Sequence, residues 1–172
     1  MNKNPRYVGK SGDKWVRLSG RFDVTLDDKY RITLPVKFRK ELNETLVITE
    51  GLNKCLYLFT SSKWEEKVAS QIDENASVFS EKDIDVMRKY IAPSHDVELD
   101  KMGRFIIPED LRKYAGILKD CKVAGMLNFI EIWDSGYHSE CFGINNEKSA
   151  NAFKEASEEF GRELKIKKGI TE

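Results

Sequence analysis

Few of the groups that build catalytic centres, disulfide frameworks or membrane spans occur in this sequence of 172 residues. Its three cysteines are an odd number and form no Cys-x-x-Cys pair, which argues against a disulfide framework. No apolar run approaches the roughly 20 residues of a membrane-spanning helix, and no signal-peptide core follows the polar start. We therefore expect a soluble protein in a reducing, cytoplasmic setting, with no membrane partner.

Catalytic and metal-binding motifs are equally scarce. His138 and Cys141 could place two metal ligands on one helical face, but no second pair completes a site, so we interpret them as a surface pair. Asp27 and Asp28 are adjacent, and in a strand their carboxylates would point to opposite sides. No glycine-rich phosphate loop or Ser/His/Asp arrangement is recognisable. We expect no enzyme activity, no metal and no cofactor.

Net charge is absent too, since 29 basic residues balance 29 acidic ones, and this alone argues weakly against a nucleic-acid partner. The distribution argues the other way. Residues 1–40 contain eleven Lys or Arg and four Asp or Glu, a net charge of +7, so the remainder carries −7. Residues 1–19 are interpreted as a basic N-terminal arm, with a disordered tail as the alternative.

What the sequence does contain is an internal repeat. Residues 26–35 and 99–108 both read Leu-Asp-x-x-x-Arg-apolar-x-apolar-Pro, at an offset of 104 − 31 = 73. Farther on, residues 51–59 match residues 125–133 at an offset of 74, which predicts one inserted residue in a loop. A unit of about 40 residues is too small to bury an adequate core by itself. We therefore expect the two copies to pack as one pseudo-symmetric body.

Hydrophobic periodicity predicts the elements of each copy. Phe22, Val24 and Leu26 alternate with polar residues, and the alternation resumes after a turn, which predicts a hairpin with Asp27 and Arg31 at its tip. The second copy has Gly103 before its arginine, where a bulged loop favours a positive φ. The first copy has Tyr30 there, which would cost roughly 1–2 kcal/mol in a left-handed conformation. That turn is either rebuilt or strained.

Proline and capping residues predict the helices. Pro35 and Pro108 precede short helices over 36–42 and 109–114, and strands follow over 46–48 and 55–59, with Cys55 and Cys121 as core residues. Ser62-x-x-Glu65 and Ser80-x-x-Asp83 predict two linker helices, the second with a hydrophobic staple of Phe79 on Ile84. An apolar stripe over 147–165 predicts a C-terminal helix that packs on its own body or on a neighbouring subunit.

The expected fold class is α+β, mostly β. Five segments are predicted: the arm at 1–19, a first repeat at 20–61, a helical linker at 62–92, a second repeat at 93–135 and a C-terminal helical segment at 136–172.

The repeated Asp-x-x-x-Arg frame resembles the MraZ family of bacterial transcriptional regulators. The resemblance covers roughly residues 20–140 and includes Pro35–Arg39, Leu56–Phe59 and Glu131–Trp133. It implies an AbrB-like swapped-hairpin fold, a double-split β-barrel, present twice in the chain. It also implies a ring-shaped homo-oligomer on the nucleoid that binds G-rich direct repeats, usually in the promoter of the division and cell-wall gene cluster. The DNA-contacting residues carried over are Asp27, Arg31, Asp100 and Arg104.

Physical chemistry fits this implication. Arginine reads guanine best, because its guanidinium can donate to O6 and N7 together in the major groove of duplex DNA. Four basic residues surround Arg31 and are predicted to contact phosphates, which position a protein without specifying sequence: Lys29, Lys37, Arg39 and Lys40. Arg104 is predicted to contribute less, since Glu109 and Asp110 leave its loop less basic.

Plainer alternatives stay open for each group. Each Asp/Arg pair could be an internal ion pair that pins its loop. Lys37, Arg39 and Lys40 could form a solvated helix face. The whole chain could be a protein-interaction module of the same fold, like the antitoxin partner of a toxin.

Overall fold

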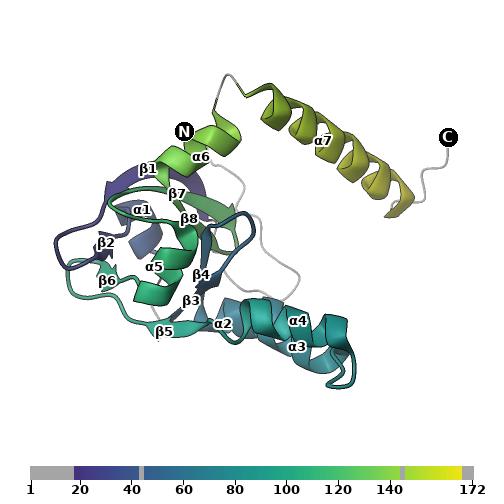
Figure 1. Cartoon of the computed structure of the whole chain (residues 1–172), viewed down its shortest axis with the longest axis horizontal. Coiled ribbons are helices and arrows are strands. Elements are labelled where there is room, and N and C mark those ends of the chain that lie inside the picture. Colours follow the sequence, from purple (N-terminus) through teal and green to yellow (C-terminus); the bar gives the residue numbers. More distant parts are fainter. Residues whose placement is uncertain (1–17, 43–44, 144–145, 168–172) are drawn as a thin grey trace, which may run out of the picture. The chain divides into compact units, whose positions relative to one another are not determined.

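A computed structural model describes residues 18–42, 45–143 and 146–167, and it divides them after Ser135 into two compact units (Figure 1). The predicted basic arm lies outside the described residues except for Leu18 and Ser19. The first unit holds both repeats and the linker between them.

Each repeat is built as strand, strand, short helix, strand, strand, as predicted. The first contains β1 (Leu18–Thr25), β2 (Arg31–Thr33), α1 (Val36–Arg39), β3 (Leu46–Glu50) and β4 (Leu56–Thr60). The second contains β5 (His95–Val97), β6 (Arg104–Ile106), α5 (Glu109–Ala115), β7 (Asp120–Leu127) and β8 (Ile130–Asp134). The linker between them is helical: α2 (Ser61–Trp64), a π-helical turn η1 (Glu65–Ala69), α3 (Ser70–Asn75) and α4 (Glu81–Tyr90).

The strands of the two repeats interleave. All pairings are antiparallel, in a six-stranded sheet of order β1-β7-β8-β4-β3-β5 and a separate ribbon of β2 with β6. The predicted pairing of the first two strands with each other is therefore wrong. β1 pairs with β7 and β2 with β6, so both strands have their partners in the other repeat. The alternation of apolar residues indicated which face of each strand is buried, and it carries no information on which strand lies beside it. This exchange defines tandem swapped-hairpin units.

A pseudo-twofold relation follows from the pairing register. Ile32 lies opposite Phe105, and 105 − 32 = 73 is the offset of the repeat. Tyr57 lies opposite Glu131, and 131 − 57 = 74 is the offset of the later blocks. In both pairs a residue lies opposite its own counterpart in the other repeat, so the pseudo-twofold axis passes between the partners of each pair. The two copies therefore form one pseudo-symmetric body.

The core confirms the predicted alternation. Ile32 and Leu34 are completely buried, while Arg31 and Thr33 on the same segment face outward. Cys55 and Cys121 are also buried, as predicted, and burial raises the pKa of each thiol to about 12. Both repeats contribute to this main core, so it belongs to neither copy alone. A second, smaller cluster of Val47, Phe59 and Trp64 packs the first repeat against the linker.

The one-residue difference in length between the repeats is the sum of two changes. Leu46 pairs with Val97, and its structural counterpart Cys121 pairs with Val24, which gives 121 − 46 = 75. The next strands return to 130 − 56 = 74, because the β3–β4 turn has three residues between its bonded ends and the β7–β8 turn has two. Two added residues before β7 and one removed after it give the net offset.

The helix ends correct two predictions. α2 begins at Ser61 with Thr60 as its cap, whose hydroxyl accepts from the Lys63 amide at 3.3 Å, so the cap predicted at Ser62 is wrong. Ser80 does cap α4, accepting from the Asp83 amide at 3.3 Å. The predicted staple is wrong, because Phe79 is 97% exposed. The Asp83 carboxylate instead accepts from the Ser77 amide and holds the loop with Phe79 outward.

The second unit contains α6 (Ser135–Phe142), except for its first residue, and α7 (Glu147–Lys167). His138 is buried, with its ring 5.2 Å from that of Phe142, so its predicted place in a surface pair is wrong. Among the described residues, no three His, Cys, Asp or Glu side chains gather as metal ligands would. The apolar stripe of α7 is exposed at Phe153 and Phe160, and its packing stays a prediction. Within the described ranges no helix is long and apolar enough to cross a membrane.

Replacing Gly125 by alanine should weaken the interleaved pairing. Its Cβ would lie 2.6 Å from the backbone carbonyl carbon of Leu18 and from the amide nitrogen of Ser19, which cannot move without opening β1 from β7. We expect a loss of about 1–3 kcal/mol in the free energy of unfolding, measured by urea denaturation with tryptophan fluorescence. Gly161→Ala, in open space on α7, is the control and should not destabilise. Equal stability of both variants would contradict the tight approach of β1 and β7.

Candidate nucleic-acid interface

The two Asp-x-x-x-Arg loops have the same hydrogen-bond scheme. In the first, Asp27 Oδ1 accepts from the amides of Lys29 at 2.9 Å and Arg31 at 3.0 Å, and the Asp27 amide donates to the Arg31 carbonyl at 3.0 Å. In the second, Asp100 Oδ1 accepts from Met102 at 2.8 Å and Arg104 at 3.0 Å. The aspartate therefore organises the loop backbone, as an aspartate at the start of a turn can.

The second oxygen of each aspartate holds the arginine. Asp27 Oδ2 lies 2.7 Å from Nε and 2.7 Å from one terminal nitrogen of Arg31, and Asp100 Oδ2 lies 2.9 and 2.8 Å from the same atoms of Arg104. The internal ion pair that the sequence left open is thus present in both loops. A guanidinium carries five N–H groups, so three remain outside each ion pair.

These contacts keep the carboxylates charged. The pKa of Asp27 is lowered from 3.8, chiefly by the backbone amide of Arg31 and then by its side chain. The pKa of Asp100 is lowered from 3.8 as well, chiefly by the side chain of Arg104 and then by its amide. Both loops therefore keep their ion pairs at neutral pH.

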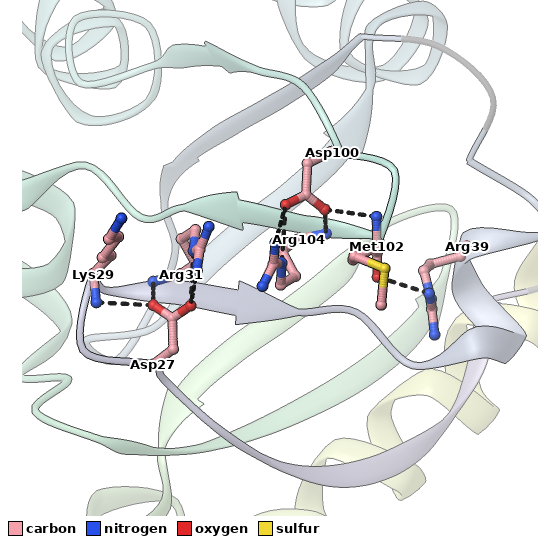
Figure 2. Close-up of polar contacts among 7 residues, drawn as sticks. All are labelled: Asp27, Lys29, Arg31, Arg39, Asp100, Met102 and Arg104. Atoms are coloured by element: carbon pink, nitrogen blue, oxygen red, sulfur yellow. Dashed lines mark hydrogen bonds and ion pairs between the residues drawn. The ribbon is translucent and has the colours of Figure 1, made fainter.

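Both arginines lie on one face of the β2–β6 ribbon. Arg31 is opposite Ile106 and Thr33 is opposite Arg104, so these four side chains share the outer face, whereas Ile32 and Phe105 are buried on the other. Figure 2 shows Arg31 and Arg104 side by side on the two strands, each bonded to its own aspartate. Diagonal neighbours in such a ribbon lie about 7–8 Å apart. Their side chains are 28% and 31% exposed, so solvent reaches both guanidiniums.

The first loop keeps its shape in spite of the tyrosine. Tyr30 has φ of 58° and Gly103 has φ of 75°, so both occupy the left-handed region. The strained alternative, and not a rebuilt turn, is the one that occurs. The Tyr30 ring carries the guanidinium of Arg112 at 3.5 Å from its centroid.

The other side chains that are predicted to contact phosphates differ in whether they already donate hydrogen bonds to groups of the protein. Lys29 and Lys40 are exposed. The ammonium group of Lys37 donates to the carbonyl and hydroxyl of Ser19 at the start of β1. Arg39 donates from a terminal nitrogen to the Met102 carbonyl at 2.8 Å, so it reaches the loop of the other repeat (Figure 2).

Arg112 contacts the first loop, and the sequence prediction missed it. The signal was present, since Arg112 follows Arg39 by the repeat offset of 73 and the segment around it matches that around Arg39. Arg112 lies on a helix with several charged residues, and the sequence of that helix does not indicate that its side chain contacts Tyr30 of the other repeat.

An interleaved double unit with an Asp/Arg loop in each copy places this chain in the class of tandem swapped-hairpin proteins. A family model described as "MraZ protein, putative antitoxin-like" matches it twice, over residues 18–87 and 91–162. A protein of Treponema denticola named "Transcriptional regulator MraZ" is 39% identical over 145 residues, which cover 84% of this chain and 97% of that protein. The chain belongs to the MraZ family.

Each arginine should set the pKa of its own aspartate alone. Arg104→Ala is expected to raise the pKa of Asp100 toward 3.8 and leave that of Asp27 unchanged. Arg31→Ala should raise the pKa of Asp27 alone, and by less, because the variant keeps the backbone amide that lowers this pKa most. Because the folded pKa values are depressed, both carboxylates stabilise the fold above pH 3.8, and this stability is lost as pH falls through the folded values. Carboxyl carbon NMR titration measures each pKa. A response of both aspartates to either variant would contradict two separate ion pairs.

Proposed function

We propose that this protein is a sequence-specific DNA-binding transcriptional regulator that recognises G-rich direct repeats in a promoter. The observation that carries the proposal is the outer face of the β2–β6 ribbon, which presents Arg31 and Arg104 together, each fixed by an aspartate. The membership in the MraZ family and the printed name of the Treponema denticola relative support regulation of transcription. By the family resemblance, the promoter is that of the division and cell-wall genes, and the protein acts in the cytoplasm at the nucleoid.

The ribbon suits the major groove of duplex DNA. That groove admits a two-stranded β-ribbon, and arginine there can donate to O6 and N7 of guanine. Asp27 and Asp100 orient the two guanidiniums in advance, so less side-chain entropy is lost when a guanine is bound. In this proposal the aspartates position the arginines, and the free N–H groups contact the bases.

Phosphate contacts are proposed for the basic side chains around the first loop. Lys29 is exposed in the loop itself and is the best placed. Lys37 and Arg39 already donate to groups of the protein, so a phosphate would have to compete with Ser19 or Met102 for them. Such contacts fix orientation and affinity and carry no sequence information.

Self-association completes the proposal. A chain with balanced charge holds DNA weakly through one ribbon, and a ring-shaped homo-oligomer would present the ribbon several times. Effective concentration then raises the overall affinity when the DNA repeats match the spacing of the subunits. The exposed apolar stripe of α7 is the proposed source of contacts between subunits.

Alanine at either loop arginine should weaken binding to G-rich repeat DNA. Loss of one bidentate guanine contact costs about 1–3 kcal/mol, which is roughly 5- to 150-fold in Kd. Fluorescence anisotropy with a labelled duplex measures the change. The matched control is Arg88→Ala on α4, which also removes an arginine paired with an aspartate, at 2.9 Å, and should leave Kd unchanged. If Arg31→Ala folds and binds as the parent does, the role of Arg31 is wrong.

Salt should separate base contacts from phosphate contacts. The logarithm of affinity is expected to fall linearly with the logarithm of salt concentration, with a slope of about −0.9 for each phosphate neutralised. Lys29→Ala should make this slope shallower by about one, and it should weaken binding equally on G-rich and unrelated duplexes. A slope unaffected by Lys29→Ala would remove that residue from the phosphate contacts.

A further inference from the structure

The short helices α1 and α5 each send an arginine to the loop of the opposite repeat. Arg39 of the first repeat contacts the second loop, and Arg112 of the second repeat contacts the first. The two arginines are related by 112 − 39 = 73, and the loop positions they meet, Tyr30 and Gly103, by 103 − 30 = 73. The crossed contact is therefore a property of the fold and occurs twice.

Arg39 fills the space that a side chain at Gly103 would need. A Cβ at Gly103 would overlap Arg39 Cδ and lie 2.8 Å from its Nε. Arg39 Nε is buried and has no hydrogen-bond partner in the described part of the chain. A solvated arginine would leave Nε hydrogen-bonded to water. Burial of Nε therefore indicates that packing on Gly103 and the hydrogen bond to the Met102 carbonyl hold the Arg39 side chain in place. Both contacted residues lie between Asp100 and Arg104.

Arg112 supports the first loop in a different way. Its guanidinium lies over the Tyr30 ring at 3.5 Å, within the range of a cation–π contact. Tyr30 is the residue whose left-handed φ closes the first loop, and its side chain is half exposed. The contact therefore stabilises the conformation that places Arg31 immediately after it on the ribbon.

We propose that Arg39 and Arg112 are positioning residues of the interface. Each sets the orientation of the loop arginine that is proposed to contact guanine in the opposite repeat. Arg39 positions Arg104 through Met102 and Gly103, and Arg112 positions Arg31 through Tyr30. This inference rests on the proposed function and assigns Arg39 a different role from a phosphate contact. The two supports are chemically unequal, so the loops are not interchangeable.

The crossed pattern is testable without DNA. In amide NMR spectra of the full chain, Arg39→Ala should shift the amides of Met102 and Gly103 and leave those of Lys29 and Tyr30 in place. Arg112→Ala should do the reverse. Lys40→Ala, at the residue that follows α1, and Lys113→Ala on α5 are the neighbouring controls and should move neither loop. If Arg39→Ala leaves the second loop unmoved, or shifts both loops alike, the proposal is overturned.

DNA binding tests whether Arg39 acts on affinity through Arg104. Arg39→Ala should raise Kd for G-rich repeat DNA about fivefold or more without changing the salt slope, because no phosphate contact is lost. Combined with Arg104→Ala it should add little, whereas combined with Arg31→Ala the effects should multiply. Arg39→Lys keeps the charge, but an ammonium group cannot reproduce the packing of the guanidinium on Gly103 together with its bond to the Met102 carbonyl. This variant should therefore not restore binding.

Opposite results are equally clear. A salt slope reduced by about one in Arg39→Ala, with rescue by Arg39→Lys, would identify a direct phosphate contact and overturn the positioning role. A parent chain that binds no G-rich DNA would defeat the proposed function. The amide shifts would still decide whether Arg39 and Arg112 shape the opposite loops.

Discussion

The two repeats share their main core because the sheet is built from strands of both. β1 completes its hydrogen bonds on β7, and β5 completes its own on β3, so the first strand of each copy lies against the third strand of the other. Apolar residues from these strands then meet in one cluster that both repeats supply. Unfolding one repeat would expose the apolar face and the backbone groups of the other, so the first unit should unfold as a whole.

That shared core fixes the ribbon on which the candidate site is built. Ile32 and Phe105 anchor β2 and β6 from below, and period-two alternation then places Arg31 and Arg104 on the outer face. The loops add a second constraint, since one aspartate in each binds both the backbone and the guanidinium. A partly exposed ion pair contributes little to stability on average. Its effect here is geometric, because it removes rotamer freedom from the two arginines.

Local patterns were sufficient to predict the elements but not their partners. The alternation at Phe22–Leu26, the prolines before α1 and α5 and the cap at Ser80 all act within a few residues, and each was predictable. The hairpin was wrong because strand pairing is decided by contacts distant in sequence. The cap at Thr60 was missed because Thr60, Ser61 and Ser62 can all cap a helix, and only the end of β4 selects among them. The aspartate and arginine of each loop were predictable from the repeat, whereas the contact of Arg112 needed the crossed packing.

Fusing the two copies in one chain lets them diverge, and they have done so, since Tyr30 occupies the position in the first loop that Gly103 occupies in the second. A symmetric homodimer of a single repeat would offer two identical loops and would match a palindromic half-site pair, reading alike from either end. The fused pair carries two different loops, so its two ends are not equivalent. In the proposed complex with duplex DNA it would lie in one preferred direction, so successive subunits of the proposed oligomer would follow sites arranged head to tail.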